Sequence, residues 1–160
     1  MRYARLTAAR RAALLAGAMV TVLLAGCGSS TSTQAALASS AGAYARLMDA
    51  SHAFARNAKG CTASSHSLAC VEAGDEVMSR AYARFATAIA AIPMPPGDPQ
   101  TAAAQVEEAA KQTSRALHAL RSSGTLAGYH TAFASSPVLG DASVLQEDYG
   151  YLHHLLATGG

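Results

Sequence analysis

The chain of 160 residues has no tryptophan, and aromatic residues make up only 6% of it. Proline occurs five times and cysteine three times. No segment shows the strict alternation of apolar and polar residues that is typical of strands, which argues against a β-sandwich or barrel. Alanine dominates the apolar residues instead. Because alanine has the highest helix propensity and lets helices pack closely, the composition favours an all-α domain.

Recognisable catalytic motifs are missing as well. The sequence contains no Gly-x-Ser-x-Gly elbow, no Ser-x-x-Lys pair and no His-Glu-x-x-His. It also lacks Glu-x-x-His, which a di-iron bundle requires, and Cys-x-x-Cys-His, which attaches haem. These absences remove the usual signatures of hydrolases, metalloenzymes and haem proteins. We therefore predict that the protein is not an enzyme and carries no cofactor or metal.

The first part of the chain has the layout of an export signal. Residues 1–11 hold four arginines and no acidic residue, and residues 12–24 are uncharged. This apolar stretch is shorter than the roughly 20 residues that a transmembrane helix needs. A basic start, a short apolar middle and small residues at the end are typical of a secretory signal peptide.

The segment ends in Leu24-Ala25-Gly26-Cys27, which resembles the lipobox of bacterial prolipoproteins: an aliphatic residue, a small residue, Gly or Ala, and then Cys. The resemblance covers only residues 1–27. It implies cleavage after Gly26, a diacylglycerol on Cys27, and anchoring at the extracytoplasmic face of the cell membrane. The expected organisation is a cleaved signal peptide (1–26), a lipidated cysteine with a flexible tether (27–34) and a helical domain (35–157).

Removing residues 1–26 changes the charge balance. The remainder has eight basic and ten acidic residues, a net charge of −2. It therefore offers no excess of positive charge for nucleic acid. The expected partners are the membrane, through the lipid on Cys27, and an envelope protein whose identity the sequence does not reveal.

Two further cysteines, Cys61 and Cys70, lie in the part of the chain that would be exported. Disulfides persist outside the cytoplasm, so we expect these two residues to pair. The bridge would close a loop of about ten residues and staple one helix end to the next. The alternative is a metal site that includes His66, but oxidation competes for the thiols and the ligand spacing is unfamiliar.

Apolar residues at helical spacing predict four main helical arms, the last one interrupted at Pro137. In the first arm, Leu37, Tyr44 and Met48 share one face, and Gly60 is the expected stop. An acidic N-cap at Asp98 is expected to open the third arm. Short connections between arms of similar length predict an up-down four-helix bundle, stapled by one disulfide. The segments are 35–57, 71–92, 98 to about 123, 126–133, and 141–157, with Asp141 capping the last.

Two sets of polar residues are candidates for binding. Glu147, Tyr151 and His154 follow one another at i, i+4 and i+7 and would form a polar strip on a helix, able to bind a cation or a partner. The alternative is an ordinary solvated helix face. The hydroxyls of Tyr44, Tyr82 and Tyr149 lie on inner stripes and would be polar contacts for a ligand between the helices.

The expected lipid anchor, the expected disulfide and the lack of catalytic motifs together predict a cell-envelope lipoprotein that acts as a non-catalytic interaction or accessory module. Exposed residues of segments 71–92 and 98–123 are candidates for its contact surface. The alternative is a lipoprotein that binds a small apolar or lipid-like ligand, or a metal, between its helices.

Overall fold

A computed structural model describes the backbone of residues 28–64 and 67–159, and the side chains of residues 32–57 and 67–159. All its regular elements are helices, which confirms the all-α prediction for the described ranges. Among these residues no helix is long and apolar enough to cross a bilayer. The helices are α2 (Gly28–Ser64), α3 (Leu68–Ala90), α4 (Asp98–Leu120), α5 (Leu126–Ser135) and α6 (Val138–Thr158).

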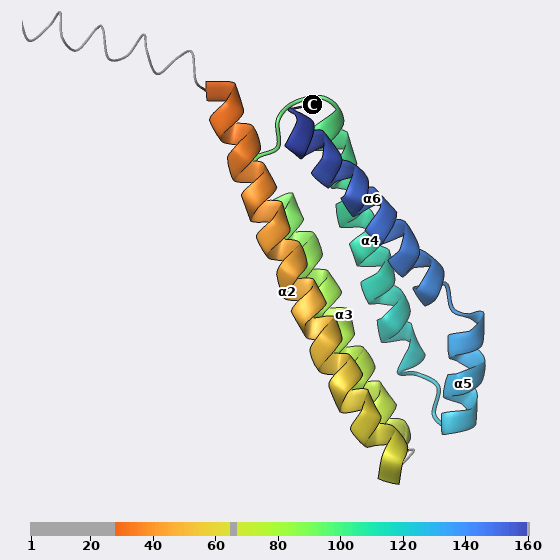
Figure 1. Cartoon of the computed structure of the whole chain (residues 1–160). Coiled ribbons are helices and arrows are strands. Elements are labelled where there is room, and N and C mark those ends of the chain that lie inside the picture. The colour runs from red at the N-terminus through yellow and green to blue at the C-terminus, as the bar shows by residue number, and fades with distance from the viewer. Residues whose placement is uncertain (1–27, 65–66, 160) are drawn as a thin grey trace, which may run out of the picture.

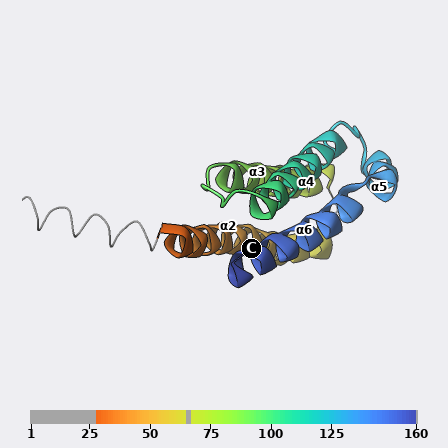
Figure 2. The same cartoon turned by 90° about the horizontal axis from the view of Figure 1, so that it is seen from above.

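The four long helices form a bundle (Figure 1). α2 contacts α3 and α6, and α4 contacts the same two helices, so each long helix has two long neighbours. Seen from above, α3 and α4 form one layer and α2 and α6 the other (Figure 2). The short α5 lies at the end of the bundle where α4 ends and α6 begins (Figure 1). α5 and α6 are therefore the two pieces of the interrupted last arm.

α2 is longer at both ends than the sequence predicted. It begins at Gly28, so the segment expected to be a flexible tether is helical, and it continues past Gly60 to Ser64. Ala36 and Ser40 are already buried near the start of the helix, which ties that end to the bundle. The cost of about 1 kcal/mol for a glycine inside a helix is small beside the packing of so long an element.

The face of α2 that packs inward also differs from the expected one. Leu47 is buried, whereas Met48, expected on the inner face, is 36% exposed. Leu37 and Tyr44 lie at the edge of the core and are only partly buried. Because alanine occurs on every side of this helix, the apolar pattern identifies the helix more clearly than the side that faces inward.

Two helix starts also differ from expectation. Gly97, with φ of 95°, precedes α4 in the position expected for Asp98. Glycine adopts this backbone conformation at little cost, and Asp98 then lies in the first turn, where its charge complements the helix dipole. α6 begins at Val138, directly after Pro137, so Asp141 lies in its first turn instead of capping it.

The buried side chains form two clusters. The first lies between the four long helices and contains many alanines together with Leu47, Phe85, Ile89 and Leu152. The second lies where α5 packs near the first half of α3 and the end of α4. Its buried members are Met78, Leu117, Leu120, Tyr129 and Val138.

Hydrogen bonds add specificity to the contact between α3 and α4. The Ser79 hydroxyl donates to the Ser114 carbonyl over 2.9 Å, and the Ser114 hydroxyl donates to the Ser79 carbonyl over the same distance. This reciprocal pair satisfies two buried or half-buried hydroxyls and fixes the register of the two helices.

Leu152 is fully buried, whereas Leu139 on the same helix is 70% exposed. We expect Leu152→Ala to lower the free energy of unfolding by about 2–5 kcal/mol, because it removes buried methyl groups and leaves a cavity. The matched variant Leu139→Ala should change it by less than about 0.5 kcal/mol. Urea denaturation followed by circular dichroism measures both. Equal losses would contradict the packing described for α6.

Candidate functional site

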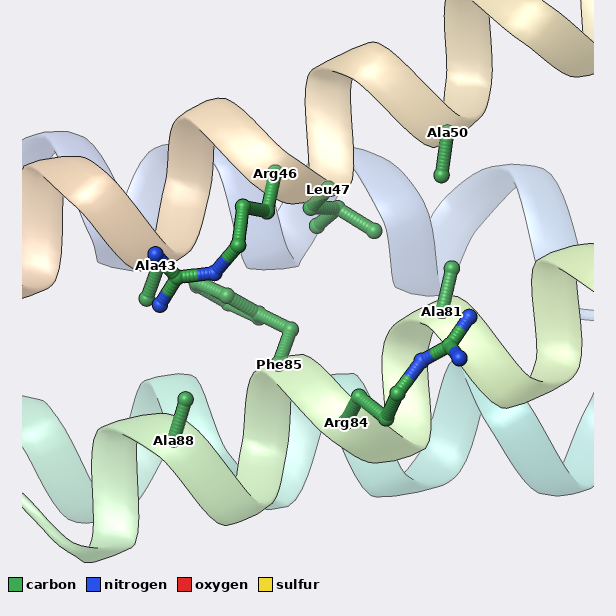
Figure 3. A pocket seen from close by; sticks show the side chains of 8 residues that line it. All are labelled: Ala43, Arg46, Leu47, Ala50, Ala81, Arg84, Phe85 and Ala88. Carbon is green, nitrogen blue, oxygen red and sulfur yellow. The ribbon is translucent and has the colours of Figure 1, made fainter.

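The main candidate site is a groove between α2 and α3, with a volume of about 300 Å³ (Figure 3). Both helices contribute apolar and basic side chains to it. Its lining residues are Ala43, Arg46, Leu47, Ala50, Ala81, Arg84, Phe85 and Ala88.

Small side chains explain why the groove exists. Farther along the same two helices, a large side chain closes the space between them: the Phe54 ring of α2 lies against Gly74 of α3, where an added Cβ would be 2.5 Å from Cε2 of Phe54. At the groove, half of the lining residues are alanines, two from each helix. Helices held at a close distance but lined by methyl groups leave space that larger residues would have filled. Leu47 and Phe85 are buried below this space and give the groove an apolar floor.

Two arginines give the groove its charge. Arg46 comes from α2 and Arg84 from α3, and both side chains lie along the groove (Figure 3). Neither forms an ion pair with an acidic side chain of the described ranges, whereas Arg80 and Arg121 both pair with Glu76. Guanidinium groups bind carboxylates and phosphates with up to two parallel hydrogen bonds. The groove thus combines an apolar floor with two cations that are available to an anion.

The predicted polar strip lies on an exposed side of α6. Glu147, Tyr151 and His154 are all exposed on the outer side of α6. Within the described ranges no group of three or more His, Cys, Asp or Glu side chains is arranged to hold a metal ion. The strip therefore has the surroundings of a solvated helix face, the alternative that the sequence left open.

Tyr149 is buried in the core, and Tyr44 and Tyr82 are partly buried against it. The grooves and hollows described here between residues of known placement are not lined by these tyrosines. Tyr44 of α2 stacks on Tyr149 of α6 with ring centroids 4.0 Å apart, and Phe85 of α3 meets both rings edge-on. Burial raises the pKa of the Tyr149 hydroxyl, and the nearby Ser40 side chain offsets part of this rise. Burial likewise raises the pKa of Tyr82. The rings of Tyr44 and Tyr149 fill the space that a ligand between α2 and α6 would need.

A buried polar pair lies under α5 and was not predicted from the sequence. Asp75 of α3 is 3% exposed, and its carboxylate accepts a hydrogen bond from the Tyr129 hydroxyl. Its Oδ2 atom has no hydrogen-bond partner among the described residues. Burial raises the pKa of Asp75, the Tyr129 hydrogen bond offsets part of this, and the charge of Glu72 raises it further. Burial and the bond to Asp75 raise the pKa of Tyr129.

Most of the predicted cysteine sites lie outside the residues that the structure describes. Cys27, His66 and the side chain of Cys61 lie outside the described residues. Cys70 lies in the first turn of α3, is half-buried, and donates its backbone N–H to the hydroxyl of the N-cap residue Ser67 over 3.3 Å.

No protein-family model, curated protein or solved structure matches this chain. The assignment of the groove as the candidate site consequently depends on its own geometry and charge.

The sequence did not predict the groove, because none of its lining residues belongs to a recognisable binding motif. The signal that indicates it is a pair of spacings: alanines seven residues apart at 43 and 50 and again at 81 and 88, each pair with an arginine between them. Seven residues are about two helical turns, so each pair lies along one side of its helix.

Asp75 generates a pH-dependent prediction. Because its pKa is raised in the folded protein above the ordinary value of 3.8, its stabilising contribution is complete below pH 3.8 and is lost as the pH rises through the raised value. Asp75→Asn removes the charge and should increase the free energy of unfolding at pH 7 by about 1 kcal/mol. The gain should shrink as the pH falls below the raised pKa of Asp75, where the carboxyl is protonated and both side chains are neutral.

Chemical denaturation of both proteins at several pH values measures this difference. Tyr129→Phe is the matched variant, because it removes the only hydrogen bond described for the carboxylate and should destabilise the protein by about 1–3 kcal/mol at pH 7. A difference between Asp75→Asn and the parent that does not vary with pH would contradict the described environment of Asp75.

Proposed function

We propose that this protein is a cell-envelope lipoprotein, anchored through Cys27 at the extracytoplasmic face of the membrane, that acts as a non-catalytic interaction module. The anchoring is supported by the lipobox-like sequence at residues 24–27. The observation that carries the binding role is the groove between α2 and α3, where Arg46 and Arg84 flank an apolar floor.

The chemistry of the groove indicates which partner fits. An envelope protein that presents an acidic side chain beside a small apolar one would match both the cations and the floor. Such a contact needs no catalytic group, and desolvated arginines are frequent among the residues that dominate binding energies. The mature chain is slightly acidic overall, so these two cations give a local preference that differs from the average surface.

A second candidate function is binding of a small amphiphilic anion in the same groove. Its volume of about 300 Å³ is at the lower limit of ordinary ligand pockets. A short apolar chain that ends in a carboxylate or phosphate would place the chain on Leu47 and Phe85 and the acid against one of the two arginines, which lie toward opposite ends of the groove (Figure 3).

We also propose that Cys61 and Cys70 form a disulfide that joins the end of α2 to the start of α3. Cys70 has an interaction beyond those described above. The two cysteines lie close in sequence, on either side of the connection between these helices. A bridge here would hold the lower end of the seam that contains the groove.

A native mass spectrum of the protein, extracted from its own membranes in mild detergent, tests the anchoring and the groove together. We expect an acyl adduct on the parent protein and none on Cys27→Ser, which should be released from the membrane because its lipid is lost. A lipid-free parent would contradict the anchoring.

The same spectrum compares Arg46→Ala/Arg84→Ala with Arg56→Ala, a matched exposed arginine of α2 that does not line the groove. A bound protein should be lost from the double variant by at least about tenfold, or 1.4 kcal/mol, and retained by the control. A bound small molecule that follows the same pattern would favour the second candidate function. An adduct insensitive to both arginines would overturn the assignment of the groove.

Removing the proposed bridge has a separate expected effect. Cys70→Ser should lower the free energy of unfolding by about 2.7 kcal/mol relative to the oxidised parent, the value expected for a loop of about ten residues. After reduction of the parent, the two proteins should unfold at similar denaturant concentrations. Thiol titration of the unfolded parent is the control, since two reactive thiols besides Cys27 without any reductant would contradict the bridge.

A further inference from the structure

Three parts of the chain meet at one end of the bundle. The start of α2, the connection between α3 and α4, and the end of α6 all lie there, opposite the end that holds α5 (Figure 1). A hollow of about 190 Å³ lies between them, lined by Thr33 from α2, Gly159 after α6, and Pro95, Pro96, Asp98 and Pro99.

The connection between α3 and α4, residues 91–97, has no charged side chain. Ile92 and Met94 are partly buried and pack against the first core cluster, so they close this end of the bundle. Ala91, Pro93 and Pro96 are exposed. The connection thus turns two side chains inward and presents an uncharged, proline-rich surface outward.

The start of α2 places this surface near the proposed anchor. Gly28 is the first helical residue and directly follows Cys27 in the sequence. Thr33, which shares the hollow with Pro95 and Pro96, is only about 8 Å from Gly28 along the axis at 1.5 Å per residue. Because α2 is helical from Gly28, the bundle can move little relative to a lipid on Cys27. The flexible tether that the sequence predicted would allow more movement.

We propose that the connection of residues 91–97 contacts the lipid surface, so that the bundle stands on the membrane with this end down and α5 at the far end. The proposal depends on lipidation of Cys27, which belongs to the proposed function. Uncharged side chains lose little on entering the zone between headgroups and acyl chains, whereas charged groups pay a large desolvation cost there. The first charged residue after the connection, Asp98, begins α4.

The absence of tryptophan makes a direct test available, because one introduced tryptophan is the only source of indole fluorescence. Pro93→Trp places it on the exposed side of the connection, and Leu139→Trp places it at an exposed site near α5, at the opposite end. Each full-length protein is matured in its own membranes, purified and reconstituted into phosphatidylcholine vesicles with or without bromine on the acyl chains.

Bromine quenches indole at contact distance. We expect at least about twofold quenching for Pro93→Trp and almost none for Leu139→Trp, since an interfacial residue lies within reach of the acyl chains. If Pro93→Trp alters the helical circular dichroism spectrum, Ala91→Trp is used in the same comparison, because Ala91 is also exposed in this segment.

The outcomes separate this proposal from the one it depends on. A mass spectrum of each reconstituted sample records the acyl group on Cys27. Equal quenching at both positions, or none at either, in a lipidated sample overturns the orientation and leaves the anchoring intact. A sample without the acyl group overturns the anchoring, and the orientation with it.

Discussion

The aromatic contact between Tyr44, Phe85 and Tyr149 is the interaction on which the bundle depends most. It joins three helices, α2, α3 and α6, within a cluster in which half of the buried residues are alanine. Each such aromatic pair contributes about 0.5–1.5 kcal/mol beyond the burial of its area. Alanine contributes little area per residue, so the few large rings supply a disproportionate share of the cohesion between the two layers.

The same reliance on alanine produces the candidate site. Where α2 and α3 meet at Gly74 and Phe54 the seam is closed, and where alanines face each other it remains open. Arg46 and Arg84 cover the open part with long side chains whose stems are apolar and whose charged ends stay in water. Stability and binding therefore make opposite demands on this seam, because larger residues that filled the groove would remove the space for a partner.

The helical class and the approximate position of every arm followed from apolar spacing, most clearly in α3, where Met78, Phe85 and Ile89 are buried as expected. Helix ends were less predictable: Gly60 and Asp141 carry the local signals of an end or a cap, but α2 continues past Gly60 and α6 begins before Asp141. The groove and the Asp75–Tyr129 pair depend on which residues of different helices face one another. One sequence contains no such information, because alanine-rich faces leave the rotation of each helix weakly determined.

Because α2 is one continuous helix, it fixes the distance between its first residue and the groove. Arg46 lies about 27 Å from Gly28 along its axis at 1.5 Å per residue. Under the proposed anchoring, the groove would open sideways at a fixed height, and a protein held in the same membrane would meet it by lateral diffusion with its acidic residue at a matching height. Selection among candidate partners would then depend on the length of their own stalks as well as on their charge.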